Sequence, residues 1–313
     1  MKNTQTYAKF TPLIALQLIA PQTWIASIMP VFFSVVYCAI SYSGTLNLLN
    51  AFILLVICNC MQSASNVLND YLDFVKGTDT EQSTTDDKFE AALVYNKVNP
   101  KAVLALFFVL LAVALGLGIY LVTLTSPLLL VIGIIGAVVV VLYSWGKVPI
   151  SYLPVGEIII GGVMGLLMPL ACCYVLSGVL DAGVLVAAFP IAWGIGMILA
   201  TNNTCDIEKD IEANRNTLAV TLGREKAVTR YRQAVLIWLA IVSVLVAVFY
   251  TNGLPIIILM IMALFPLLRA VKNNPFIQAT RDPSMSQVVS LNIIIGAFYL
   301  AALLFSGQVT WLF

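Results

Sequence analysis

The chain has 313 residues, of which 61% are hydrophobic and 10% are charged, with a formal net charge of +1. Soluble domains carry about a quarter charged residues, so this composition excludes an ordinary water-soluble protein. The near-zero net charge argues against nucleic acid as a partner, and the absence of His excludes imidazole bases and His-ligated metal sites.

Apolar runs long enough to cross a bilayer recur along the whole chain. Residues 102–124 and 128–143 are apolar on every face, which excludes the alternating pattern of a β-barrel and favours an all-α bundle. The runs predict nine transmembrane helices, at residues 12–40, 46–70, 101–123, 127–145, 154–177, 182–202, 230–250, 254–271 and 287–312. Pro21 and Pro30 interrupt the first run, which is expected to be kinked or tilted. We expect one transmembrane domain over residues 1–313.

The basic residues indicate the orientation of this bundle. With the N-terminus inside, all 16 Lys and Arg residues fall in the inner segments or at the adjoining helix ends. The positive-inside rule then predicts a multi-pass protein of the cell membrane with a cytoplasmic N-terminus and an extracytoplasmic C-terminus. Two long inner segments, residues 71–100 and 203–229, are expected to form cytoplasmic caps over a cavity. The sequence does not indicate an oligomeric state.

Two acidic clusters stand where apolar helices meet the cytoplasmic boundary. Asn66, Asp70 and Asp73 stand at the end of the second predicted helix at spacings i, i+4 and i+7, which places them on one helix face. At the end of the sixth predicted helix, residues 202, 206 and 210 are Asn, Asp and Asp at spacings i, i+4 and i+8, and again share one helix face. Stacked like charges repel, and acidic groups near hydrocarbon are costly. Oxygen ligands of this kind suit Mg²⁺ or Ca²⁺, and two such faces opposite one another would hold a diphosphate through the metal.

Other polar residues near these helix ends have candidate roles. Lys76 and Lys147 are expected to contact phosphate oxygens, and Tyr143 places an aromatic ring beside them. For Glu157, in the fifth predicted helix, a functional and a structural role are equally supported. Asn292, in the last one, is expected to form a packing hydrogen bond between helices.

Three stretches resemble a known family, the UbiA-type intramembrane prenyltransferases. They are NDYLDFVKGTD at residues 69–79, LYSWGKVPISYLPVGE at 142–157 and NNTCDIEKDIEANRNTLAVTLG at 202–223. Within that family they are similar to the 1,4-dihydroxy-2-naphthoate polyprenyltransferases of menaquinone and demethylmenaquinone synthesis. The resemblance covers essentially the whole chain and implies nine helices with cytoplasmic caps.

The resemblance also implies a reaction, namely Mg²⁺-dependent transfer of a polyprenyl group from its diphosphate to 1,4-dihydroxy-2-naphthoate, which gives demethylmenaquinol. The implied metal ligands are Asp70, Asp73, Asp206 and Asp210, assisted by Asn66 and Asn202. Asp79 is a candidate for orienting or deprotonating the acceptor. The implied substrate-binding residues are Asn66, Asn69, Lys76, Tyr143, Lys147, Asn202, Asn203 and Arg215.

Two alternatives stay open at this point. In the first, the protein catalyses the same prenyl transfer to 4-hydroxybenzoate or another aromatic ring. In the second, the protein is a transporter of Mg²⁺ or another cation. A transporter is expected to carry polar groups near the middle of the membrane. Both clusters stand instead at one membrane face, which favours the enzyme.

Overall fold

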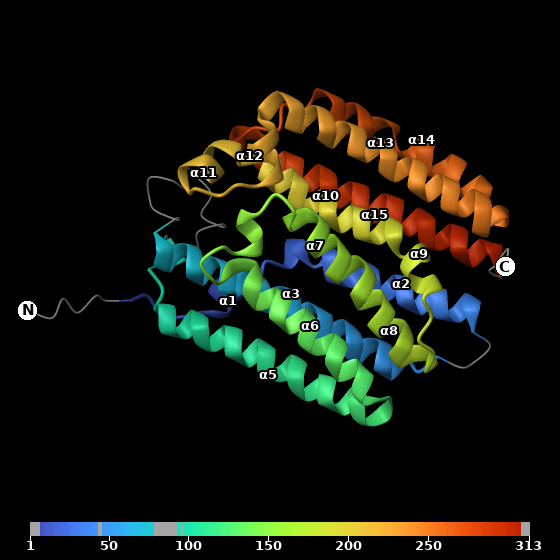
Figure 1. Ribbon diagram of the computed structural model, residues 1–313, viewed down its shortest axis with the longest axis horizontal. Helices are drawn as coiled ribbons and strands as arrows, with labels where there is room; N and C mark the ends of the chain where they lie inside the picture. The colour runs from blue at the N-terminus through green and yellow to red at the C-terminus, as the bar shows by residue number, and fades with distance from the viewer. Residues whose placement is uncertain (1–6, 43–45, 78–92, 95–96, 308–313) are drawn as a thin grey trace, which may run out of the picture. The chain divides into compact units, whose positions relative to one another are not determined.

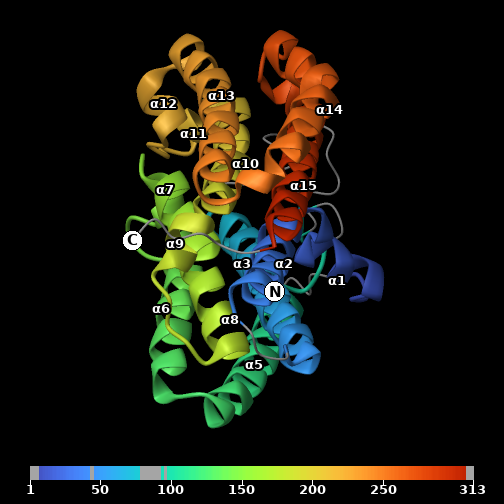
Figure 2. The same cartoon turned by 90° about the vertical axis from the view of Figure 1, so that its right-hand side faces the viewer.

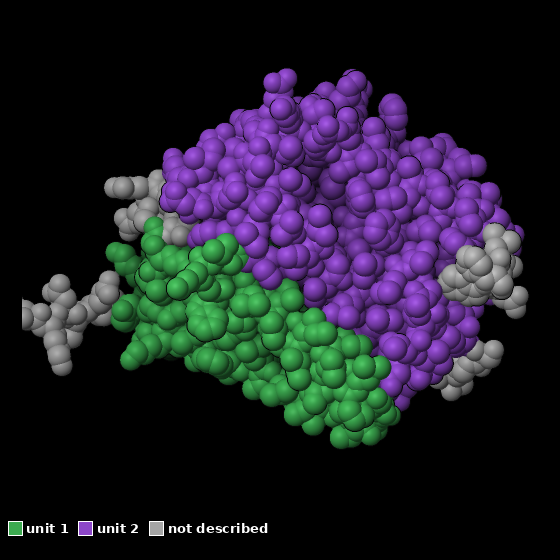
Figure 3. Space-filling model, viewed as in Figure 1, with its two compact units in different colours: residues 1–24, 55–149 green, residues 25–54, 150–313 purple. Residues whose placement is uncertain are grey.

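The computed structural model describes residues 7–42, 46–77, 93–94 and 97–307. Within these residues the regular structure is helical, apart from an isolated parallel bridge between Ala8 and Val98 (Figure 1). The chain forms two compact units, residues 1–24 with 55–149 and residues 25–54 with 150–313 (Figure 3). The single domain over residues 1–313 stays a prediction.

The first unit contains α1 (Pro12–Ile19), η1 (Pro21–Thr23), most of α3 (Leu48–Lys76), α5 (Pro100–Leu124) and α6 (Pro127–Ser144). Three of these helices begin with Pro at their first position, where no intrahelical N–H bond is lost, behind a residue whose side-chain oxygen caps the first turn. The capping residues are Thr11, Asn99 and Ser126. Local sequence therefore determines where these helices start.

The second unit contains α2 (Ile25–Ser41), η2 (Ile150–Tyr152), α7 (Gly156–Gly162), the π-helical η3 (Val163–Leu167), α8 (Met168–Ser177), α9 (Gly183–Ala187), α10 (Phe189–Cys205), α11 (Ile207–Glu212), α12 (Leu218–Leu222), α13 (Arg224–Phe249), η4 (Thr251–Gly253), α14 (Leu254–Asn273), η5 (Gln278–Thr280) and α15 (Arg281–Ser306). Helix α10 packs against α7, α13 and α15, and α14 lies along α15 (Figure 2). The second predicted cap, residues 203–229, consists largely of the short helices α11 and α12 and the start of α13.

The helices confirm an all-α membrane protein. Seven helices of the described residues are long and apolar enough to cross a membrane, and the broken pair of α1–η1 with α2 makes eight if it counts as one span. Helix α10, with 17 residues, occupies the remaining predicted span. The number nine stays a prediction.

The predicted interruption of the first span is present at Pro21 and absent at Pro30. Helix α1 ends at Ile19 because Ala20 adopts a left-handed conformation with φ 47°, and η1 begins at Pro21. Pro30 lies inside α2 without ending it. One of the two proline residues therefore terminates a helix.

The core of the first unit fixes the end of α3 that carries the first acidic cluster. Ala64, Val67 and Leu68 recur at helical spacing and are buried with Leu18 of α1 and Phe107 of α5. The end of α3 therefore has an apolar face that packs in this core, and its polar residues lie outside that face.

Small residues let α10 approach its neighbours in the second unit. A Cβ at Gly165 of η3 would lie 2.6 Å from the Cβ of Ala192. Asn292 of α15 donates to the carbonyl oxygens of Gly194, at 3.2 Å, and Val288, at 2.9 Å, which agrees with its predicted packing role.

Replacing Gly165 by Ala is therefore expected to destabilise the protein. The added methyl group overlaps the Ala192 backbone, and overpacking of this kind costs about 1–3 kcal/mol, more than the ~1 kcal/mol that Ala gains over Gly in a helix. Gly162→Ala, in the same span, is the matched control because nothing lies within 4 Å of its Cβ position. Thermal unfolding in detergent should show a lower midpoint for Gly165→Ala alone. Equal midpoints for both variants would contradict the packing described.

Candidate active site

The first acidic cluster lies in the last turns of α3. Because α3 continues without a break to Lys76, Asn66, Asp70 and Asp73 share one helix face, as their spacing predicts. Asp73 is buried, with 7% of its surface exposed, and Asp70 is half-buried. Asp79 lies outside the described residues.

Asn69 and Lys76 connect this cluster to the end of α6. The amide nitrogen of Asn69 donates to Asp73 Oδ2 at 3.2 Å, and its amide oxygen accepts from Ser144 Oγ at 2.8 Å. Lys76 Nζ donates to the carbonyl oxygen of Ser144 at 3.0 Å. Asn69 thus orients Asp73, and Lys76 places a positive charge at the junction of the two helices.

Tyr143 and Lys147 belong to the same junction. Tyr143 precedes Ser144 and is half-buried, whereas Lys147 follows α6 and is exposed. Gly146, between them, has φ 118°, a conformation that favours glycine. The structure therefore brings these two predicted residues to the α6 end that Asn69 and Lys76 contact.

Asn66 is held by the segment that follows α1. Its amide nitrogen donates to the carbonyl oxygen of Ile19 at 3.1 Å and to Thr23 Oγ1 at 2.9 Å. These bonds use the nitrogen and orient the amide group. The amide oxygen, the atom that ligates metal ions, makes neither of these bonds.

The second acidic cluster differs from its sequence prediction. Helix α10 ends at Cys205, Asp206 has φ −99° and ψ 18°, and α11 begins at Ile207. Asn202, Asp206 and Asp210 therefore lie on two helices and the residue between them, not on one helix face. The four-residue spacing survives in the backbone, since Asp206 N–H donates to Asn202 O at 3.0 Å and Asp210 N–H to Asp206 O at 2.8 Å.

Arg281, the first residue of α15, contacts this cluster and was not predicted as a site residue. Its Nε donates to Asp206 Oδ2 at 3.0 Å, and its Nη2 donates to Asn202 Oδ1. The predicted orientation assigns Arg281 to the membrane side of the clusters, but it assigns all 16 basic residues there. Nothing in its local pattern distinguishes it from the others.

Asp206 is the most unusual carboxylate of this cluster. Its Oδ1 is buried and has no hydrogen-bond partner among the described residues. Burial raises the pKa of Asp206 to about 7; the charge of Asp210 acts in the same direction, and nearby basic residues, Lys209 first, act against it. A buried carboxylate oxygen without a partner is costly, so this atom is suited to a cation supplied from outside the protein.

Asp210 and Arg215 stand on either side of the turn that follows α11. Asp210 is buried and its Oδ2 accepts from Thr217 Oγ1 at 3.2 Å. The Arg215 guanidinium lies 5.0 Å from the centre of the Tyr152 ring, within the range of a cation–π interaction. Arg215 N–H also donates to the carbonyl oxygen of Asp210 at 2.8 Å. The two predicted residues are thus held in one turn.

Asn203 joins the cluster to α7. Its amide nitrogen donates to Glu157 Oε1 at 2.8 Å. The other carboxylate oxygen of Glu157, Oε2, is buried without a hydrogen-bond partner in the described part of the chain. Asn203 therefore has a structural contact in addition to its predicted substrate role.

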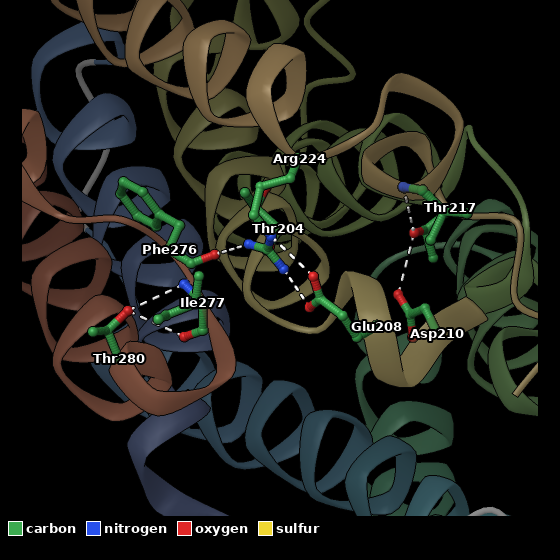
Figure 4. A network of polar contacts seen from close by, with 9 residues as sticks. Thr204, Glu208, Asp210, Thr217, Arg224, Phe276, Ile277 and Thr280 are labelled. Carbon is green, nitrogen blue, oxygen red and sulfur yellow. Dashed lines mark hydrogen bonds and ion pairs between the residues drawn. The ribbon is translucent and has the colours of Figure 1, made fainter. Parts of the chain in front are cut away.

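Arg224, at the start of α13, connects the second cluster to the segment before α15 (Figure 4). Its guanidinium forms a two-point ion pair with Glu208 and donates to the carbonyl oxygens of Thr204 and Phe276. Burial raises the pKa of Glu208, but the hydrogen bonds from Arg224, a backbone hydrogen bond and the charge of Arg224 together lower it below its ordinary value. Glu208 therefore pairs with Arg224 and is not part of the second acidic cluster.

The donor set fits Mg²⁺ held together with a phosphate-bearing ligand. Carboxylate and amide oxygens are the ligands of hard divalent cations, and Asp206 Oδ1 lacks any other partner in the described chain. Within the described residues, no three Asp, Glu or Cys side chains gather into a metal site of their own. Proteins typically hold Mg²⁺ by one or two carboxylates, with phosphate oxygens of the substrate completing the shell.

Fold and site together define a class: a multi-pass helical membrane protein with acidic clusters at helix ends that suit a divalent cation. Residues 27–282 match the sequence model of the UbiA prenyltransferase family. The chain belongs to this family and is a polyprenyltransferase, as the resemblance of its motifs implies.

The similar proteins support this assignment. A 1,4-dihydroxy-2-naphthoate octaprenyltransferase of Bacillus subtilis is 33% identical over 213 residues, 68% of this chain and 67% of the relative. A UbiA homologue from Archaeoglobus fulgidus matches with a TM-score of 0.64 at 15% identity, over 93% of this chain and 98% of that one. The same homologue bound to GPP and Mg²⁺ matches at 0.59 and 16%, over the same shares. At these identities the solved structures show the fold.

Proposed function

We propose that this protein transfers a polyprenyl group from polyprenyl diphosphate to 1,4-dihydroxy-2-naphthoate in a Mg²⁺-dependent reaction that gives demethylmenaquinol. The choice of 1,4-dihydroxy-2-naphthoate as the acceptor is supported by the 33% identity with the Bacillus subtilis enzyme. Support for the metal and the donor comes from the archaeal homologue bound to GPP and Mg²⁺ and from the unpartnered Asp206 Oδ1 of this chain.

Both acidic clusters supply metal ligands in this proposal. Bound Mg²⁺ neutralises the charge that develops on the leaving diphosphate. The residues that hold it are Asp70, Asp73, Asp206 and Asp210, with Asn66 and Asn202. Asp206 and Asp210 are both buried, and they lie at and just beyond the point where α10 ends and α11 begins.

Basic and aromatic residues assist the departure of the diphosphate. Lys76, Lys147 and Arg215 contribute positive charge to its oxygens. The allylic C–O bond breaks with its electron pair on the diphosphate, and the Tyr143 ring shelters the allylic cation. A ring carbon of the acceptor then forms the new C–C bond as its carboxyl group leaves as CO₂. Asn69 orients Asp73, and Asn203 is held by Glu157; both Asn side chains contact the substrates in this proposal. Asp79 is the proposed group that orients or deprotonates the acceptor.

The membrane setting suits these substrates. A polyprenyl tail is soluble in lipid, whereas its diphosphate needs metal and water at the membrane face. We propose that the clusters face the cytoplasm at the cell membrane, because all 16 basic residues fall on the cluster side when the N-terminus is inside.

A metal-removal assay tests the proposed reaction. Purified protein in detergent is incubated with polyprenyl diphosphate, Mg²⁺ and 1,4-dihydroxy-2-naphthoate, with or without EDTA, and products are identified by mass spectrometry. We expect a prenylated quinol that EDTA abolishes and added Mg²⁺ restores. Turnover with 4-hydroxybenzoate in place of the naphthoate would reassign the acceptor. Failure with every aromatic acceptor, despite Mg²⁺-dependent binding of the diphosphate, would overturn the proposed reaction and leave a member of the family whose acceptor is not an aromatic ring.

A further inference from the structure

Arg281, the first residue of α15, places a guanidinium directly on the second acidic cluster. It bridges two proposed metal ligands, with Nε on Asp206 Oδ2 at 3.0 Å and Nη2 on Asn202 Oδ1. A guanidinium is a rigid planar fork, so these two bonds fix the relative position of both acceptors. Asp206 lies between α10 and α11, outside both helices.

The contact occupies only one oxygen of Asp206. Oδ2 accepts from Arg281, while Oδ1 is buried and without a partner in the described chain. A two-point pair would have engaged both carboxylate oxygens. The observed one-point contact leaves one oxygen available while holding the carboxylate in place.

Arg281 is itself held in position by the turn between α14 and α15. The buried Asn274 side chain accepts from Phe276 N–H at 2.9 Å and donates to Ser284 Oγ at 2.8 Å and Gln287 Oε1 at 2.9 Å. Arg232 of α13 donates to the carbonyl oxygen of Asn274 at 2.9 Å. This network fixes the start of α15, and therefore the origin of the Arg281 side chain, without touching Asp206.

We infer that Arg281 is a positioning residue of the metal site: it orients Asp206 and Asn202 so that Asp206 Oδ1 faces the cation. The inference rests on the proposed function, because it takes these residues as metal ligands. It extends that proposal to a residue from α15, outside every motif that carries the family resemblance.

Charge and positioning predict opposite effects of substitution. Arg281 repels a nearby Mg²⁺, so loss of its charge alone would tighten metal binding. Loss of an outer partner that orients a ligand typically weakens metal binding about 10- to 100-fold. Arg281→Lys separates the two effects, because Lys keeps the charge but is a single point donor that cannot reproduce the fork.

The test measures metal binding apart from turnover. Mn²⁺ is titrated into the purified protein with geranyl S-thiolodiphosphate, a donor analogue that does not react, and free Mn²⁺ is followed by electron paramagnetic resonance. We expect Arg281→Lys and Arg281→Gln each to raise the Mn²⁺ dissociation constant at least about 10-fold. Arg230→Gln is the matched control, since Arg230 is exposed on α13 and its guanidinium bonds Gln233 of the same helix, and it should leave that constant within about 2-fold of wild type.

Several outcomes would overturn the inference. These are wild-type metal affinity in both Arg281 variants, tighter binding in Arg281→Gln with unchanged binding in Arg281→Lys, or an equal loss in Arg230→Gln, which would indicate a general effect of removing a basic residue. Absence of Mn²⁺ binding in the wild type would overturn it as well. If the wild type binds Mn²⁺ but prenylates no aromatic acceptor, the proposed function fails while the binding data still decide the role of Arg281.

Discussion

Replacing Asp206 by Asn is expected to lower kcat at least about 10²-fold. The substitution keeps the shape of the side chain and an oxygen that can accept from Arg281, but it removes the negative charge from the buried atom that has no partner in the described chain. Transfer should fail because the diphosphate can no longer be held and neutralised through metal at this position. Initial rates at saturating donor, acceptor and Mg²⁺ measure the effect.

Glu208→Gln is the matched control for this prediction. Glu208 lies two residues away on α11, but its side chain is 61% exposed and pairs with Arg224 (Figure 4). Exposed ion pairs contribute about 1 kcal/mol or less, so this variant should keep kcat within about 5-fold of wild type. Similar losses in both variants would mean that disturbance of the cap, not loss of a metal ligand, causes the effect.

Replacing Asp70 by Asn is expected to produce a loss of the same size, at least about 10²-fold in kcat. Asp70 stands on the α3 face between Asn66 and Asp73, in the other compact unit of the chain. If both clusters serve one reaction, removing either should abolish most of the same rate enhancement. The double variant Asp70→Asn with Asp206→Asn should then be little slower than either single variant, because residues that act as a unit are not additive.

Glu225→Gln provides the control for Asp70, because it removes an exposed acid at the start of α13, outside both clusters. Its rate should match wild type. Multiplicative losses in the double variant would show that the two clusters act independently and would remove the basis for a shared metal–diphosphate site.

The sequence predicts the transmembrane helices well because a bilayer demands about twenty apolar residues in succession. Helices α5 and α6 begin and end within a residue of their predicted bounds, 101–123 and 127–145. Each begins with Pro behind a capping side chain, and both signals can be recognised in the local sequence. The polar ends of α3 and α13 are less well predicted, since these helices continue into charged residues, to Lys76 and from Arg224.

The first cluster was predictable because its residues lie on one uninterrupted helix. The second was predictable in composition but not in geometry: the spacing of Asn202, Asp206 and Asp210 fits a continuous helix, yet the helix breaks at Asp206. The contact with Arg281 spans 75 residues of sequence. Periodicity reports only neighbours three or four positions apart, so a single sequence gives no signal for such a pair.

The same limit applies to the hydrogen bonds that orient the cluster residues. Asn203 meets Glu157 across 46 residues, and Ser144 meets Asn69 across 75. The motif resemblance identified these Asn residues as candidates for substrate binding. Their partners are brought together by tertiary packing. Glu157, which the sequence shows only as a lone acid in an apolar helix, accepts a hydrogen bond from Asn203 through Oε1.

The central claim is that the clusters hold a metal-bound diphosphate. Its most direct measurement is a crystal structure of the protein grown with Mn²⁺ and geranyl S-thiolodiphosphate, with the metal located by its anomalous signal. The account predicts metal peaks within about 2.3 Å of carboxylate oxygens from both clusters, Asp206 Oδ1 among them, and bonded to diphosphate oxygens. A bound diphosphate with no metal at Asp70, Asp73, Asp206 or Asp210, or with metal elsewhere, would contradict it.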